Sequence, residues 1–429
     1  MPAKFLFVSY TGLIADIAWQ VVKEGHEAKL FIEDQEEKEI GDGFVPKITD
    51  WKNEVEWADV VVFDDVLGMG AMAEELRKKN KRVVGGSSYT DRLEDDRGFG
   101  QQELKAAGVS IIPQENFTSF DDAVAYVTAN PNRYVIKPSG EAQNEKRLLF
   151  VGEEEDGRDV IQVLGDYKRA WSAKIKAFQL QRRVVGVEVA VGAFFNGKEF
   201  ILPINVNFEH KKLFPGDIGP PTGEMGTSMF WSEPNRIFNA TLKKMEAKLA
   251  EERYTGYIDV NCIVNNNGIY PLEFTARFGY PAISIQQEGL LTPLGELLRG
   301  LADGTLSRVR AKSGFQLGVR IVVPPFPYRD METLESTSKD AVILFKTPSR
   351  EGYHIEDVRT VDGEWLVTGT SGVALLVCGT GPTMKQAQRM AYNRVKNVMI
   401  PHMYYREDIG DRWFEEDSDR LHAWGYLRD

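Results

Sequence analysis

Short apolar runs alternate with amphipathic stretches over the first part of the chain. The apolar runs fit β-strands and the stretches between them fit helices, with strands expected at residues 5–9, 28–32, 60–63 and 81–84 and helices at residues 14–23 and 71–79. Strands that are apolar throughout and separated by helices are typical of a parallel sheet covered on both faces. The pattern therefore predicts an N-terminal parallel α/β domain over residues 1–92.

The carboxyl ends of these strands are where a ligand of such a sheet would bind. They carry residues 9–12 and the acidic pair Asp64 and Asp65. Only Gly12 follows the first strand, whereas a dinucleotide-binding turn needs several glycines at fixed spacing. The sequence thus argues against NAD or FAD as a cofactor.

The rest of the chain divides by its pattern into two further parts. Residues 93–315 mix helices and strands, and one strand, at residues 133–137, ends in Lys137 before a polar loop. From about residue 316 the sequence becomes rich in strands, followed by a helix with apolar residues at helical spacing. We predict a middle α/β domain over residues 93–315 and a C-terminal α+β domain over residues 316–429.

Two strands joined by an asparagine-rich turn carry the most specific chemical signal. Residues 258–264 and 269–275 are apolar runs, yet they contain the acids Asp259 and Glu273. A buried carboxylate is costly unless a cation or hydrogen bonds hold it. Thr275 shares a face with Glu273, because side chains in a strand alternate with a period of two. These oxygens predict a site for phosphate-bound Mg²⁺ (or Mn²⁺); the alternative is two strand-end acids in water.

The length of the turn decides whether the two acids share a face. A three-residue loop at residues 265–267 places Asp259 directly opposite Glu273, whereas a two-residue loop shifts the pairing by one and separates them. We predict the three-residue loop.

Composition and charge narrow the possible partners. Hydrophobic residues make up 42% and charged residues 27% of the 429 positions, which is ordinary for a globular protein. The net charge of -12 argues against non-specific binding to nucleic acid or to an anionic membrane. Cys262 and Cys378 lie in apolar runs and are expected to be free thiols. We find no signal peptide and no membrane-spanning run, so we expect a cytoplasmic protein.

Two further segments have the properties of a nucleotide site. Lys137 ends an apolar strand, from which its ammonium group could reach a phosphate, and the loop at residues 139–146, which includes Lys146, could cover phosphates. The alternative for Lys137 is a surface lysine whose stem packs on apolar groups. Residues 181–185, which begin with Gln181, fit a hinge whose backbone pairs with adenine, or equally an ordinary edge strand.

The richest polar loop covers residues 207–226. It is rich in glycine and proline and carries charges of both signs. Long ordered loops in compact domains are usually functional; the alternative is a mobile surface flap. His210 in this loop is by itself more typical of a structural residue than of a catalytic one.

Three segments, taken in order, resemble the ATP-grasp ligases of the phosphoribosylamine–glycine ligase type. Residues 210–212 and 217–226 are similar to the family's histidine–lysine pair and its TGPNTGGMG stretch, residues 272–281 to its EFNxRFGDPE, and residues 405–412 to its YRxDIGxR. The likeness runs nearly end to end. It implies an ATP-grasp fold in which two lobes of the middle domain enclose ATP, preceded by a pre-ATP-grasp domain.

The resemblance implies roles for individual residues. The catalytic residues would be Lys137 and Arg277, and the metal ligands Asp259, Glu273 and Thr275. ATP contacts would come from Arg97, Lys137, Lys146, Gln181 and Glu188. Substrate contacts would come from His210, Lys211, Asp217, Gly219, Thr222, Gly223, Asp64, Asp65, Arg406 and Asp408.

Several positions depart from the family pattern. Residues 8–15 and 63–68 stand where the family has the glycine-rich GNGGREHA and the GPEAPL loops, and the acids Asp64 and Asp65 would repel a phosphate there. Thr275 replaces a metal-binding asparagine and Arg97 a phosphate-binding lysine. These departures argue against phosphoribosylamine as the amine substrate more than they argue against binding of ATP or the metal.

We therefore expect an ATP-dependent ligase that joins a glycine-like carboxylate to an amine through an acyl phosphate. Its amine acceptor can differ from phosphoribosylamine, and the acidic pair favours a cationic or sugar-like acceptor. The alternatives are a true phosphoribosylamine–glycine ligase of purine synthesis and a nucleotide-binding pseudoenzyme. A monomer or a homodimer is expected.

Overall fold

The computed structural model describes residues 2–140, 142 and 148–427. The N-terminal part is a parallel sheet of strand order β2-β1-β3-β4. It is made of β1 (Lys4–Ser9), β2 (Glu27–Ile32), β3 (Val60–Phe63) and β4 (Val83–Val84), with helices α1 (Ala15–Lys23) and α2 (Met69–Lys78). Alternate residues of β1 belong to two different cores, one containing Ala18 of α1 and the other Ala73 of α2. The sheet is covered on both faces, as predicted.

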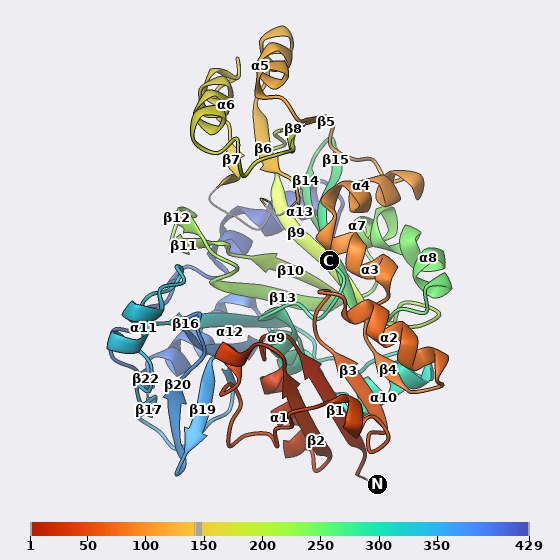
Figure 1. Cartoon of the computed structure of the whole chain (residues 1–429), viewed down its shortest axis with the longest axis vertical. Helices are drawn as coiled ribbons and strands as arrows, with labels where there is room; N and C mark the ends of the chain where they lie inside the picture. The colour runs from red at the N-terminus through yellow and green to blue at the C-terminus, as the bar shows by residue number, and fades with distance from the viewer. Residues whose placement is uncertain (1, 141, 143–147, 428–429) are drawn as a thin grey trace.

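A second small sheet forms a lobe at the top of the molecule in Figure 1. Its strand order is β5-β8-β6-β7, with β5 (Gln114–Phe117), β6 (Tyr134–Pro138), β7 (Phe150–Val151) and β8 (Phe178–Arg182). Helices α5 (Phe120–Ala129) and α6 (Arg158–Ala170) pack beside it. The lobe has an apolar core of its own, which includes Phe120, Tyr134, Leu164 and Phe178.

The centre of the molecule is an eight-stranded sheet of order β15-β14-β9-β10-β13-β16-β21-β18, in which neighbouring strands are antiparallel. Its members are β9 (Val187–Asn196), β10 (Ile204–Glu209), β13 (Gly226–Ser232), β14 (Thr255–Asn265), β15 (Gly268–Thr275), β16 (Phe315–Val322), β18 (Tyr353–Ile355) and β21 (Val373–Gly381). The predicted boundary near residue 315 therefore lies between strands of one sheet, and the division into domains there stays a prediction.

The remaining elements surround these three sheets. Helices α3 (Ser88–Asp95) and α4 (Arg97–Ala106) contact β15, and α9 (Ala282–Gly289) and α12 (Met384–Val395) contact β16 and β21. The others are β11 (Lys212–Phe214), β12 (Ile218–Pro221), α7 (Arg236–Ala240), α8 (Glu246–Glu251), α10 (Leu294–Asp303), α11 (Met331–Thr337), β17 (Leu344–Phe345), β19 (Val358–Val361), β20 (Glu364–Val367), β22 (Val398–Met399) and α13 (Ser418–Ala423).

The state of the two cysteines and the absence of a membrane-spanning run were both predicted from the sequence. Cys262 and Cys378 are free and buried, as predicted. Within the part of the chain that the structure describes, no helix combines the length and the apolar character that crossing a membrane requires.

The turn between β14 and β15 is shorter than the sequence suggested. Asn265 pairs with Gly268, which leaves a two-residue turn, so the predicted three-residue loop is wrong. Asp259 pairs with Thr275 and Glu273 pairs with Asn261, so the predicted pairing of Asp259 with Glu273 is also wrong. A turn of this length alone would send the two acids to opposite faces.

A β-bulge in β15 returns the acids to one face. Cys262 pairs with Pro271, but the preceding Asn261 pairs with Glu273, so Leu272 is an extra residue in β15. An extra residue reverses the alternation of the side chains that follow it. Gln101 of α4 holds this bulge, because its Nε2 donates hydrogen bonds to the carbonyls of Pro271 at 3.1 Å and Leu272 at 2.8 Å.

Candidate functional site

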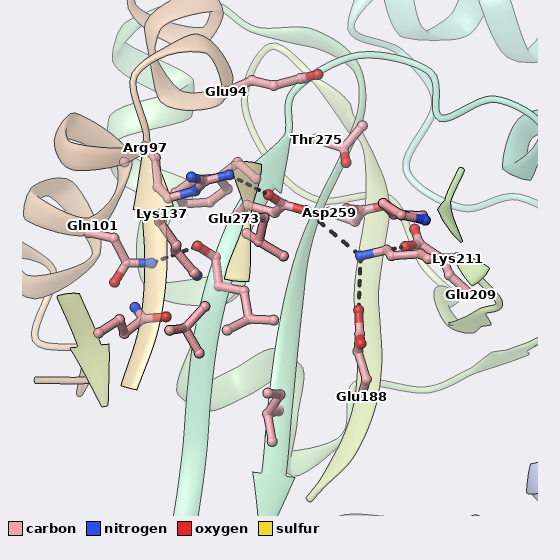
Figure 2. Close-up of a pocket in the computed structure, with 18 of the residues that line it drawn as sticks. Glu94, Arg97, Gln101, Lys137, Glu188, Glu209, Lys211, Asp259, Glu273 and Thr275 are labelled. Atoms are coloured by element: carbon pink, nitrogen blue, oxygen red, sulfur yellow. Dashed lines mark hydrogen bonds and ion pairs between the residues drawn. The ribbon is translucent and has the colours of Figure 1, made fainter. Parts of the chain in front are cut away.

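A cavity of about 730 Å³ lies between the small lobe and the central sheet. The lobe contributes Lys137 at the end of β6 and Gln181 on β8, and the central sheet contributes Asp259 on β14 and Glu273 on β15. Helices α3 and α4 and the loop at residues 207–226 supply further walls. Figure 2 shows charged side chains from these elements directed toward one another.

Lys211 is the centre of a charged network on the sheet side of this cavity (Figure 2). Its Nζ lies 2.8 Å from Glu188 Oε1, 3.1 Å from Glu209 Oε2 and 3.8 Å from Glu273 Oε1. Asn261 Nδ2 donates to the same Glu188 oxygen at 3.0 Å. Burial acts to lower the pKa of Lys211, but Glu209 and Glu188 outweigh it and hold the pKa well above its usual value. The lysine therefore stays charged and fixes the positions of three carboxylates.

Two more cations, Lys137 and Arg97, lie near the lobe side of the cavity. Lys137 is buried, and its burial and the neighbouring Arg97 lower its pKa to about 8. Arg97, the first residue of α4, has its Nη2 3.5 Å from Glu273 Oε2. Lys137 is buried and Arg97 is half-buried, and placing two cations close together is costly unless anions lie near them. This wall of the cavity is therefore suited to the phosphates of a nucleotide.

Asp259, Glu273 and Thr275 form a set of oxygen ligands that fits Mg²⁺. The bulge places Glu273 and Thr275 on the face that Asp259 occupies, and Thr275 hydrogen-bonds to Asp259. Burial and the nearby Glu209 raise the pKa of Asp259 well above its usual value. Mg²⁺ is commonly held by one or two carboxylates together with substrate phosphates. The described residues contain no set of three or more acids, histidines or cysteines that alone could hold a metal.

Arg277 leaves β15 toward the N-terminal part and is held there by acids. Its Nη2 lies 3.2 Å from Glu94 Oε1 and its Nε lies 3.7 Å from Asp65 Oδ1. The other oxygen of Glu94 accepts a hydrogen bond from the backbone N–H of Ala276 at 2.8 Å. Glu94 thus fixes both the main chain after the metal ligands and the orientation of the arginine.

The structure places the acidic pair of the N-terminal sheet beside Arg277, and neither acid is among the described residues that line the cavity. Asp64 Oδ2 accepts a hydrogen bond from Ser9 Oγ at 2.5 Å. Burial and the adjacent Asp65 raise the pKa of Asp64 to about 7. A direct substrate contact by these two residues stays a prediction.

The loop at residues 207–226 is ordered, because β11 and β12 pair within it and the turn between them is tied to the C-terminal segment. Arg406 is buried and makes ion pairs with Asp217 at 2.8 Å and with Asp408 at 2.5 Å. Asp408 also accepts from the backbone N–H of Gly216 at 2.9 Å. These contacts fasten the loop in place, which is a structural use of residues for which substrate contacts were predicted.

The predicted substrate residues of this loop divide into two groups. Lys211, Thr222 and Gly223 line the cavity, whereas His210, Asp217 and Gly219 are not among its described lining residues. His210 is buried, and its Nε2 accepts a hydrogen bond from the backbone N–H of Gly410 at 3.3 Å.

The predicted nucleotide residues Arg97, Lys137, Gln181 and Glu188 all line the cavity, and their contacts with ATP stay predictions. Lys146 lies outside the described residues.

Five polar residues of the site were missed by the sequence analysis, namely Glu94, Gln101, Glu209, Glu224 and Asn261, all of which line or contact the cavity network. Asn261 could have been found, because it lies two residues after Asp259 on the same strand and so shares its face. Gln101 on α4 bonds to the main chain of β15, and Glu94 on α3 bonds to the main chain just after β15. No local pattern in the sequence predicts contacts between elements so far apart in the chain.

Comparison with known proteins agrees with this geometry. A family model for the ATP-grasp (A) domain of phosphoribosylglycinamide synthetase matches residues 95–283. A phosphoribosylamine–glycine ligase of Halalkalibacterium halodurans is 27% identical over 363 residues, which cover 81% of each chain. One of Lactococcus lactis is 25% identical over 362 residues, which cover 80% of this chain and 81% of the relative.

Solved structures show the same fold. The crystal structure of phosphoribosylamine–glycine ligase from Thermotoga maritima is similar, with a TM-score of 0.68 at 21% identity over 95% of this chain and 100% of that one. The biotin carboxylase domain of the Hydrogenobacter thermophilus 2-oxoglutarate carboxylase, solved with MgADP, has a TM-score of 0.64 at 13% identity over 100% of both chains. The resemblance that the sequence indicated is confirmed: the chain has an ATP-grasp fold, and residues 95–283 match the ATP-grasp domain of phosphoribosylglycinamide synthetase.

Proposed function

We propose that the chain is an ATP-dependent carboxylate–amine ligase that forms an amide through an acyl phosphate. One observation carries the proposal: Lys137 of the small lobe, Arg97 of α4 and the oxygens of Asp259, Glu273 and Thr275 on the central sheet all line one cavity. Cations suited to phosphate and oxygens suited to Mg²⁺ therefore share a single space. The similarity to phosphoribosylamine–glycine ligases supports the same reaction class.

Each group of residues in the cavity would have a separate role. Lys137 and Arg97 would bind ATP phosphates, and Glu188 and Gln181 would bind the nucleoside part. Mg²⁺ held by Asp259, Glu273 and Thr275 would neutralise phosphate charge. The carboxylate substrate attacks the γ-phosphorus and ADP leaves; the amine then attacks the acyl carbon and phosphate leaves. Arg277 would steady an acyl-phosphate oxygen from the wall where Glu94 holds it.

The charge around Arg277 bears on the identity of the amine acceptor. The wall around Arg277 carries Glu94 and Asp95, and Asp65 contacts Arg277 from behind the lining, so the balance of charge there is negative. Such a wall favours an acceptor that presents a cation or hydroxyl groups there and disfavours a phosphate. The second candidate, a true phosphoribosylamine–glycine ligase, is favoured by the names of the curated relatives.

A substrate screen tests the proposal. The protein is incubated with Mg-ATP and every pair from a panel of amino acids and amines, including glycine with phosphoribosylamine. ADP release is measured together with the mass gain of a condensation product. We expect ADP and product in equal amounts with at least one pair. ATP binding without ADP release for all pairs would instead favour a nucleotide-binding pseudoenzyme.

A further inference from the structure

Glu224 is a buried carboxyl group on the cavity wall that lacks a partner for one of its oxygens. The residue is 6% exposed and lines the cavity, and its Oε1 has no hydrogen-bond partner among the described residues. The family stretch TGPNTGGMG, which this loop resembles, has glycine at the same position. The carboxyl group therefore stands at a position where the family motif has no side chain.

The main chain at Glu224 is clamped, which orients the side chain. Arg320 of β16 donates from Nη1 to the carbonyl of Glu224 at 3.1 Å, and its backbone N–H donates to the carbonyl of Met225 at 3.0 Å. The guanidinium of Arg320 is itself paired with Glu356, with both contacts at 2.9 Å. Arg320 thus holds the backbone of Glu224 while its charge is shared with another acid.

The other charged neighbours of Glu224 leave it short of positive charge. Glu209 is an acid, and Lys211 is already shared among Glu188, Glu209 and Glu273. Burial and Glu209 together raise the pKa of Glu224 well above its usual value. A buried carboxyl group is costly to ionise without a cation, so a positively charged ligand group in the cavity would gain a strong partner here.

We propose that Glu224 binds the primary ammonium group of a substrate and selects for substrates that carry one. This inference rests on the proposed ligase function, because both a glycine-like donor and an amine acceptor present such a group. A carboxylate and an alkylammonium ion make a charge-assisted hydrogen bond, which is stronger than a neutral one. A phosphate at the same position would be repelled, which makes Glu224 a specificity residue of this site.

The test measures binding, so that it does not depend on turnover. Saturation-transfer NMR with the MgADP-loaded protein compares three probes: glycine, ethanolamine, and acetate, which lacks the ammonium group. Wild type is compared with Glu224→Gln, which keeps the size of the side chain, and with Glu335→Gln, a control at an exposed position on α11. The ADP affinity of each variant is also measured, because an affinity equal to that of wild type shows that the fold and the nucleotide site are intact.

We expect Glu224→Gln to weaken binding of an ammonium-bearing probe at least tenfold, as for loss of one partner of a buried charge pair. Acetate binding and the control variant should match wild type. Weaker binding of glycine by Glu224→Gln would assign the subsite to the carboxylate donor. Weaker binding of ethanolamine would assign it to the amine acceptor. Equal binding of both ammonium probes by wild type and Glu224→Gln, or no binding of either by wild type, overturns the inference. Failure of the ligase proposal would appear separately, as absence of ADP release in the substrate screen.

Discussion

At the scale of single residues, Glu273 connects the two halves of the site. One carboxylate oxygen lies 3.5 Å from Arg97 and the other lies 3.8 Å from Lys211. The same side chain shares its face of the sheet with Asp259 and Thr275. Glu273 therefore contacts Arg97, which is assigned to phosphate binding, and belongs to the set assigned to the metal.

Replacing Glu273 by alanine should abolish ADP release in the presence of the productive substrate pair. Loss of a metal carboxylate costs several kcal/mol of transition-state stabilisation, or roughly a hundredfold or more in rate. The measurement is the initial rate of ADP formation at saturating Mg-ATP. Asn266→Ala, in the exposed turn of the same hairpin, is the control and should keep the wild-type rate. Turnover of Glu273→Ala at that rate would refute the assigned role.

At the scale of elements, the geometry of the site depends on contact between α4 and β15. The sequence showed that both strands are apolar runs carrying acids, and that Glu273 and Thr275 share a face, because these are local properties. The pairing partners could not be obtained in this way. They depend on a two-residue turn and a compensating bulge at Leu272, which Gln101 holds from a helix about 170 residues earlier in the chain.

Gln101→Ala should release the bulge and disturb the metal ligands. The substitution leaves the carbonyls of Pro271 and Leu272 without their donor, which costs about 1–3 kcal/mol for buried groups. We expect a lower free energy of unfolding in denaturant titration and a higher Mg²⁺ concentration for half-maximal ADP release. Gln102→Ala, at the adjacent exposed position of α4, should change neither quantity. An unaltered Mg²⁺ requirement in Gln101→Ala would show that the bulge does not position the ligands.

The same distinction between local pattern and distant packing applies to the loop at residues 207–226. Its composition predicted an ordered functional loop, and its resemblance to a family motif identified the positions. Only the fold shows that Arg406, from near the C-terminus, is buried against Asp217 and Asp408. These residues tie two distant segments together, so a family motif alone could not separate them from residues such as Lys211 that line the cavity.

At the scale of the whole molecule, a buried charged cluster joins the three parts of the chain. His354 of β18 places its Nδ1 2.8 Å from Asp16 of α1 and its Nε2 3.1 Å from Glu288 of α9. Asp16 Oδ2 also accepts hydrogen bonds from Ser284 at 3.0 Å and from Gln287 at 2.9 Å. The cluster therefore connects helix α1 of the N-terminal part, helix α9 and strand β18 of the central sheet.

His354 and Asp16 stabilise each other's charged forms. Burial acts to lower the pKa of His354, but Asp16 outweighs it and holds the pKa well above its usual value. Burial likewise acts to raise the pKa of Asp16, and His354 outweighs it and keeps the pKa below its usual value. Glu288, Cys378 and Lys23 are the other titratable groups that face the pair. The imidazolium is thus the form of His354 that the fold stabilises.

The stability of the protein should therefore fall at alkaline pH through His354. Because its pKa is raised on folding, its contribution is complete below the unfolded value of about 6.5 and is lost as the pH rises through the folded value. His354→Gln should cost about 3–5 kcal/mol near pH 6, since it leaves the buried Asp16 and the half-buried Glu288 without their shared cation. Denaturant titrations at pH 6 and in the alkaline range should show the difference from wild type shrinking as pH rises. His402→Asn, at an exposed position, serves as the control, and a difference independent of pH would contradict the assignment.

The central claim about the molecule is that it activates a carboxylate by phosphorylation. The most direct test uses the productive carboxylate labelled with ¹⁸O in both oxygens, Mg-ATP and the amine, followed by mass spectrometry of the released phosphate. If an acyl phosphate forms, one labelled oxygen passes from the carboxylate to each phosphate, and the amide keeps the other. Phosphate that carries no label, while amide and ADP accumulate, would contradict the account.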